Sequence, residues 1–124
     1  MRWAGIVASL ALVGLMATAG PAFASFGAVA YDDATGHFGF SWSQPTQERA
    51  TELALKDCAS AKCHAFPVPP AKCGALATSN DPKESSAWGG AVRDDRPAAE
   101  LAAMENCQKH TKGQCKVRGS ECNR

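Results

Sequence analysis

The sequence carries no marked excess of charge of either sign and no apolar run of the roughly 20 residues that a membrane-spanning helix needs. Thirteen lysine and arginine residues stand against twelve aspartate and glutamate residues in a chain of 124. This balance disfavours a nucleic-acid-binding domain, which carries a basic excess, and a disordered segment, which carries a high net charge. At roughly 100 to 200 residues per domain, the length predicts a single domain.

Signatures of catalysis are also missing. The sequence contains no Gly-x-Ser-x-Gly elbow, and every cysteine has a candidate disulfide partner, so no nucleophile can be identified. The three histidines, His37, His64 and His110, belong to different predicted elements, where a solvated or packed imidazole is the commoner role. The sequence therefore predicts no catalytic residue.

The N-terminus has the pattern of a secretory signal peptide. One arginine precedes an uncharged apolar run that ends at Met16, and Ala22-Phe23-Ala24 supply small residues at the positions that a signal peptidase reads. Residues 1–24 are therefore predicted to be a signal peptide that is removed before Ser25. Residues 25–124 are predicted to form one secreted or periplasmic domain with no membrane contact and no nucleic-acid partner.

The predicted mature part contains an internal repeat, with approximate halves 26–72 and 73–124. GAVAY at 27–31 matches GALAT at 74–78, and each is followed by a polar turn and a second stretch of strand character, HFGFSW or AWGGAV. This pattern predicts two hairpins. A helical pattern and another cysteine-containing strand follow in each half, so the repeated unit is strand, strand, helix, strand.

Both predicted helices have a start signal and an apolar stripe of small side chains. Thr46 precedes QERATELALKDC and Asp95 precedes RPAAELAAMENC, and both side chains can accept hydrogen bonds from first-turn amides. Alanines and a final cysteine recur at helical spacing, which favours close packing on a sheet. The predicted fold is α+β, with two ββαβ-like repeats whose antiparallel sheet is packed by two helices and stapled by disulfides.

The order of these segments resembles a known family. FGAVAY, HFGFSW, the helix ending in Cys58, KCHAF, CGALAT and the second helix ending in Cys107 together resemble the secreted bacterial domains of unknown function numbered 4189. The resemblance covers nearly the whole mature part and departs from the family pattern in the polar segment from Pro82 to Ser86. It implies a fold and export but no activity and no catalytic residues.

The six cysteines indicate a disulfide framework, because their number is even and the chain is short and exported. The repeat suggests that each helix-end cysteine pairs with one on the following strand and that the remaining two pair with each other. The suggested pairs are Cys58–Cys63, Cys107–Cys115 and Cys73–Cys122. Fifteen pairings are open to six cysteines, and the sequence does not exclude the others.

Motifs with a likeness to cofactor sites have simpler explanations. CASAKCH at 58–64 resembles a widely spaced haem-attachment motif, and the cysteines and histidine around it could be written as zinc ligands. Disulfides account for both halves of the chain, whereas haem would explain one half. DDATG at 32–36 lacks the alternating ligands and closing glutamate of a calcium loop. No metal and no cofactor is predicted.

Four aromatic residues are the candidates for a partner surface. Phe38, Phe40 and Trp42 alternate along one predicted strand and so point to one face, and Trp88 lies on the corresponding strand of the second half. A core face beneath a helix is the default interpretation. An exposed stripe would instead mark a site for a partner.

Two functions from different classes follow. The favoured one is a secreted, disulfide-stabilised binding module for an unknown protein or cell-wall partner, because a rigid sheet loses little entropy when it binds. The alternative is a small cell-envelope hydrolase that acts on glycans with paired carboxylates. That alternative requires one of the histidines to share a concave pocket with Asp32 or Asp94. The oligomeric state is not predicted.

Overall fold

The structure is a computed structural model that describes residues 24–124. The predicted signal peptide lies outside the described residues except for its last residue, Ala24. Within the part of the chain that is described, no helix is both long and apolar enough to cross a membrane.

The elements follow one another as two similar ββαβ units. The first repeat consists of β1 (Phe26–Tyr31), β2 (Phe38–Gln44), α1 (Gln47–Cys58) and β3 (His64–Val68). The second repeat consists of β4 (Cys73–Ser79), a short 3-10 helix η1 (Pro82–Glu84), β5 (Trp88–Arg93), α2 (Arg96–Gln108) and β6 (Cys115–Cys122). The predicted α+β fold and its repeated strand, strand, helix, strand order are confirmed.

Each repeat forms its own three-stranded antiparallel sheet, with the first strand of the repeat in the centre. The strand orders are β2-β1-β3 and β5-β4-β6. Val29 on β1 is paired with Phe40 and Phe66 on its two neighbours, while Leu76 on β4 is paired with Gly90 and Gly119. The second strand of each repeat, β2 or β5, is therefore an edge strand.

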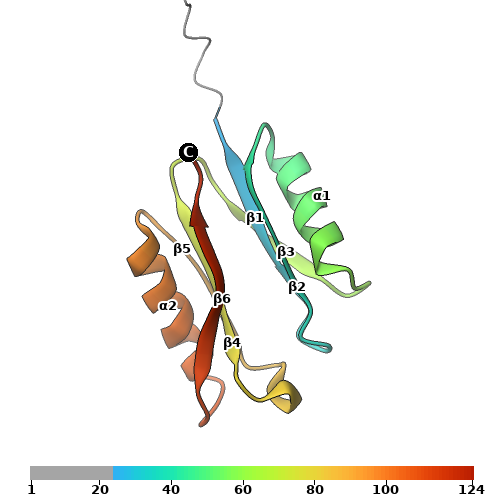
Figure 1. The fold of residues 1–124 in the computed structure, drawn as a ribbon, viewed down its shortest axis with the longest axis vertical. Coiled ribbons are helices and arrows are strands. Elements are labelled where there is room, and N and C mark those ends of the chain that lie inside the picture. The colour runs from blue at the N-terminus through green and yellow to red at the C-terminus, as the bar shows by residue number, and fades with distance from the viewer. Residues whose placement is uncertain (1–23) are drawn as a thin grey trace, which may run out of the picture.

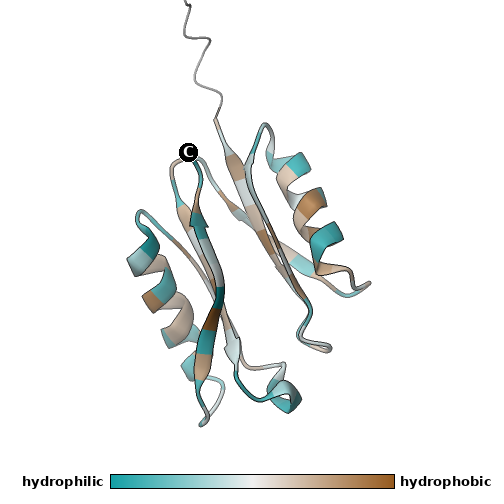
Figure 2. Ribbon diagram, in the orientation of Figure 1, coloured by the Kyte–Doolittle hydropathy of each residue, from teal (hydrophilic) through white to brown (hydrophobic). Residues whose placement is uncertain are grey.

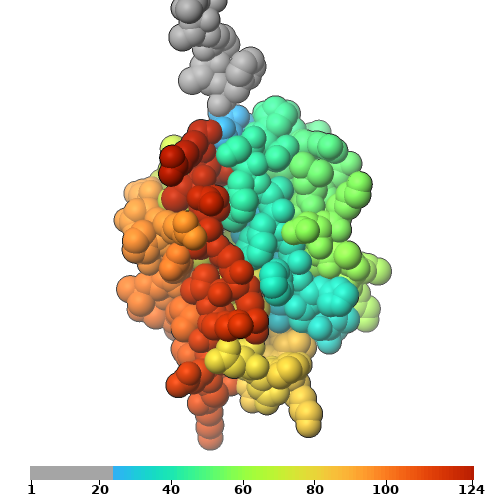
Figure 3. All heavy atoms as spheres, in the orientation of Figure 1, coloured from blue at the N-terminus to red at the C-terminus, as the bar shows by residue number. Residues whose placement is uncertain are grey.

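The two sheets stack face to face, and one helix covers the outer side of each (Figure 1). The space-filling view shows β6, in red, lying along the blue-green first repeat (Figure 3). A central cluster between the sheets is built on Val29, Tyr31, Val68 and Leu76. Alanines and cysteines fill the two layers between helix and sheet. The loop that contains η1 is hydrophilic (Figure 2).

Glycine allows both helices to sit unusually close to their sheets. A β-carbon on Gly39 of β2 would lie 2.3 Å from the carbonyl oxygen of Ala54 in α1. A β-carbon on Gly89 of β5 would lie 2.3 Å from the carbonyl oxygen of Ala103 in α2. The same helix-to-strand contact is therefore built twice, once in each repeat.

Both predicted helix caps are confirmed. The Thr46 side chain accepts a hydrogen bond from the N–H of Arg49 at 3.1 Å, and Asp95 accepts one from Ala98 at 2.8 Å. Each cap satisfies an amide that has no partner within the first helical turn.

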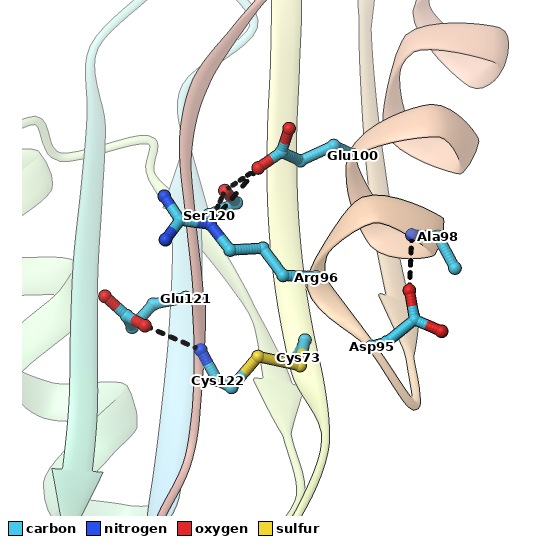
Figure 4. Close-up of polar contacts among 8 residues, drawn as sticks. All are labelled: Cys73, Asp95, Arg96, Ala98, Glu100, Ser120, Glu121 and Cys122. Atoms are coloured by element: carbon cyan, nitrogen blue, oxygen red, sulfur yellow. Dashed lines mark hydrogen bonds and ion pairs between the residues drawn. A yellow bond between two sulfur atoms is a disulfide. The ribbon is translucent and has the colours of Figure 1, made fainter.

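All three suggested disulfides are present, and no cysteine among them is free. Cys73 and Cys122 are directly opposite each other on β4 and β6, so their bond joins two strands of one sheet (Figure 4). Close to this bond, Arg96 at the start of α2 donates to the Ser120 hydroxyl of β6 at 2.8 Å (Figure 4). The start of α2 is thus attached to the second sheet.

Candidate functional site

The structure distributes the four candidate aromatic residues over different surroundings. Phe40 and Trp42 are half-buried and pack on the cluster between the two sheets. These two rings therefore lie on a core face, as the default interpretation expected. The expectation that a helix covers this face is wrong, because Gly39 takes the helix side and leaves the aromatic rings on the side of the other sheet. Phe38 is 38% exposed and lines a small cavity, and Trp88 lines a separate groove.

The histidines and the two acids of the hydrolase alternative do not come together in either of the two cavities that we describe within residues 24–124. His37, His64 and His110 are all exposed. His110 lines the groove that Trp88 also lines, but neither Asp32 nor Asp94 is part of that lining. The arrangement that the alternative requires is therefore not found in this groove.

Asp32 and Asp94 have structural roles instead. Asp32 is fully buried, where the Ser60 hydroxyl donates to it and the N–H of Ala34 donates at 2.9 Å. The hydrogen bond from Ser60, with that from Ala34, outweighs burial and lowers the pKa of Asp32 to about 2. Asp94 is exposed, and its ion pair with Lys72 lowers its pKa.

A groove of about 530 Å³ lies along the free edge of β5. We call it the β5 groove. Its apolar lining includes the rings of Trp88 and Phe66, the second of which comes from β3 in the other sheet. Asn106 and His110, from α2 and the loop after it, form the opposite wall, and Arg93 lies at the end of the strand.

The backbone of β5 is the floor of this groove. The Ser79 N–H donates to the Ala87 carbonyl at 3.0 Å, which fixes the alternation of the antiparallel ladder. Odd-numbered residues of β5 bond to β4. The even-numbered residues Gly90 and Val92 therefore turn their N–H and C=O groups toward the free edge.

Two side chains occupy the outward carbonyls and leave the outward amides free. The Asn106 amide nitrogen donates to the Gly90 carbonyl at 3.0 Å, and the Arg93 guanidinium donates to the Val92 carbonyl at 2.8 Å. No side chain within residues 24–124 accepts a hydrogen bond from the N–H of Gly90 or Val92. The edge of β5 thus presents a row of donors to the groove.

The corresponding edge in the first repeat is closed differently. The Phe40 N–H, which faces the free edge of β2, donates to the Asp57 carboxylate at 2.9 Å. Asp57 and Asn106 occupy equivalent places in α1 and α2, and Phe40 and Gly90 occupy equivalent places in β2 and β5. The Asp57 carboxylate accepts from a backbone N–H at the free edge of β2. The Asn106 side chain instead donates to a backbone carbonyl at the free edge of β5.

A second, smaller cavity of about 210 Å³ lies between the hairpin loops of the two repeats. The Tyr31 hydroxyl donates to the Ser85 carbonyl at 2.5 Å, and Arg118 donates to the Thr78 hydroxyl at 2.6 Å. Burial, with a contribution from Asp33, raises the pKa of Tyr31. The first hydrogen bond joins the two repeats and the second lies within the second repeat, so polar groups that line this cavity already have partners in the protein.

No group of three or more His, Cys, Asp and Glu side chains that could hold a metal ion occurs in the part of the chain covered by the structure.

Comparison with known proteins agrees with the resemblance seen in the sequence. The family described as Domain of unknown function (DUF4189) matches residues 26–122. The chain belongs to this family. The NMR structure of Rv1813c from Mycobacterium tuberculosis is similar to this DUF4189 domain, with a TM-score of 0.61 and 29% sequence identity over 83% of this chain and 78% of that chain. No curated protein sequence matches this one.

Sequence reasoning missed most of the β5 groove of this DUF4189 domain. It singled out Trp88 and His110 but not Phe66, Arg93 or Asn106, which only the stacking of the two repeats brings to one place. One signal was available, because the pair Gly89-Gly90 within a strand indicates that other groups approach the backbone closely.

Proposed function

We propose that this DUF4189 domain is a secreted or periplasmic binding module whose ligand site is the β5 groove. One observation carries the proposal: the groove contains both aromatic rings and the backbone N–H groups of Gly90 and Val92, which have no partner within residues 24–124. Ligand sites are mostly apolar depressions with a few convergent polar groups that fix orientation, and this groove has that composition.

The disulfide framework supports both parts of the proposal. Three disulfides in a small domain persist in an oxidising compartment, which is consistent with export. Cys107–Cys115 lies at the end of α2, near the Asn106 and His110 wall of the groove. A wall fixed in this way loses little entropy on binding.

The β5 groove lacks the pair of carboxyl groups that the glycan-hydrolase alternative requires. A glycoside hydrolase places two carboxyl groups on either side of the scissile bond. No aspartate or glutamate lines the β5 groove. The proposal is therefore for binding without turnover.

The proposal is tested by mapping ligand contacts on the oxidised, isotopically labelled protein by NMR. Pools of short peptides and of soluble cell-wall glycans serve as probes, and we expect shifts of the amide signals of Gly90 and Val92. His110→Ala should weaken binding of the probe that gives these shifts, whereas His37→Ala, an exposed histidine outside the groove, should not. Shifts confined to other surfaces, or equal effects of the two variants, would overturn the assignment.

A further inference from the structure

We propose that the ligand of the β5 groove is an extended acidic peptide segment of a partner protein, which adds to the free edge of β5 as a fourth strand. This inference rests on the proposed function and specifies the partner class. Three features of the groove carry it: the spacing of its donors, the nature of its edge caps and the sign of its charge.

The free amides of Gly90 and Val92 are spaced as an extended peptide requires. Two residues along a strand correspond to about 6.7 Å, and the carbonyls on one side of an extended peptide repeat at the same distance. Two such carbonyls can therefore accept from Gly90 and Val92 at once. At this rise per residue, β5, with its six residues, accommodates a partner segment of similar length.

The caps on β5 imitate a partner strand and can be displaced. The Asn106 amide donates to the Gly90 carbonyl at 3.0 Å, as the N–H of an added strand would. Natural proteins cover edge strands to prevent unwanted pairing. On β5 this cover consists of two side chains, Asn106 and the exposed Arg93, which an incoming backbone replaces without disturbing the ladder to β4. Strand addition of this kind is a recurrent mode of peptide recognition.

The charge of the groove selects an acidic segment. Arg93 is permanently charged, and no carboxylate lines the groove. An acidic side chain near Arg93 gains a charge-assisted hydrogen bond, whereas a basic side chain meets like charge. Trp88 and Phe66 supply apolar contacts for a neighbouring side chain of the same segment.

The experiment uses the oxidised protein and an array of acidic hexapeptides, with a matched array in which glutamine and asparagine replace the acids. We expect binding to the acidic array only. The best acidic hexapeptide is then made in two forms, N-methylated at its odd or at its even residues. Because strand pairing uses every second amide, one form should bind about tenfold more weakly and the other should keep its affinity.

Charge is tested with two exposed arginines. Arg93→Gln should weaken binding of the acidic hexapeptide by about threefold to tenfold, whereas Arg49→Gln, on α1 of the first repeat, should leave it unchanged.

Several results would overturn the inference. These are equal effects of the two methylation patterns, no effect of Arg93→Gln, and failure of every acidic peptide to bind. If an oligosaccharide that bears carboxylates binds the groove and acidic peptides do not, the peptide inference is wrong while the proposed binding function stands. If no probe shifts the groove signals, both are wrong.

Discussion

Phe40 on β2 and Gly119 on β6 fit together across the interface between the two sheets. A β-carbon on Gly119 would lie 2.5 Å from Cζ of Phe40, so the ring occupies the space that the missing side chain leaves. Phe66 on β3 and Gly90 on β5 make the related contact, with a distance of 2.6 Å from the added β-carbon to Cε1. The first repeat supplies the volume in both contacts and the second repeat supplies the space.

This relationship predicts a non-additive double mutant. Gly119→Ala should lower the free energy of unfolding by about 1 to 3 kcal/mol, because the added methyl overpacks the interface. Phe40→Leu removes Cζ, so the double variant should lose less stability than the sum of the two single changes. Guanidinium unfolding measures all three variants, and strictly additive losses would show that the two residues do not pack as described.

The helix-to-strand contacts predict that Gly39→Ala and Gly89→Ala are both strongly destabilising. The added β-carbon would meet helix backbone at 2.3 Å in each repeat, and backbone yields less easily than a flexible side chain. We expect a loss of at least about 2 kcal/mol in each case. Gly113→Ala, whose β-carbon would come no closer than 3.4 Å to a neighbouring atom, Oγ1 of Thr111, is the matched control for thermal unfolding. Melting temperatures that match the control would contradict the close approach of the helices.

The disulfides should contribute unequally to stability. By loop entropy, Cys73–Cys122, which spans 49 residues, is worth about 4 kcal/mol, and Cys58–Cys63, which spans five, about 2 kcal/mol. Replacing the first pair with serine should therefore lower the unfolding free energy more than replacing the second. Denaturant titration of the two double variants under oxidising conditions decides the order, and the reverse order would refute it.

The lowered pKa of Asp32 predicts that acid reduces the stability of the folded protein. Its pKa is lowered from an ordinary 3.8 to about 2 in the folded protein, so its ionised form stabilises the fold above pH 4. This contribution is lost as the pH falls from about 4 to 2. Asp32→Asn should therefore reduce stability near neutral pH and make little difference near pH 2. Asp33→Asn, at the exposed neighbouring residue, is the control. If the stability lost in Asp32→Asn were the same near neutral pH and near pH 2, the charge of Asp32 would not be its cause.

The local features of the fold follow from the sequence because they depend on nearby residues. Thr46 and Asp95 mark the helix starts through their own side-chain oxygens, and the repeat suggests that Cys107, at the end of a helix, pairs with Cys115 on the following strand. The division of the strands between two sheets does not follow in this way. Ala-rich β1 and β4 are buried on both faces, so hydrophobic alternation gives no indication of which face meets the other repeat.

The candidate site escaped prediction for a related reason. Phe66 and Asn106 lie 40 residues apart and belong to different repeats, and they meet only because β3 lies against β5 across the sheet interface. The hydrophobic periodicity of a single helix or strand does not indicate that these two residues line the same groove. The alternation predicted that Phe40 and Trp42 share a face, but it could not indicate that this face turns toward the other sheet.

The central claim is that β5 offers unpaired amides to a ligand, and amide hydrogen exchange tests it residue by residue. In the free protein the N–H groups of Gly89 and Ala91, which bond to β4, should exchange slowly, whereas those of Gly90 and Val92 should exchange fast. Saturating the groove with its best acidic hexapeptide should slow Gly90 and Val92 and leave Gly89 and Ala91 unchanged. Slow exchange of all four amides in the free protein, or unchanged fast exchange of Gly90 and Val92 in the complex, would contradict the account.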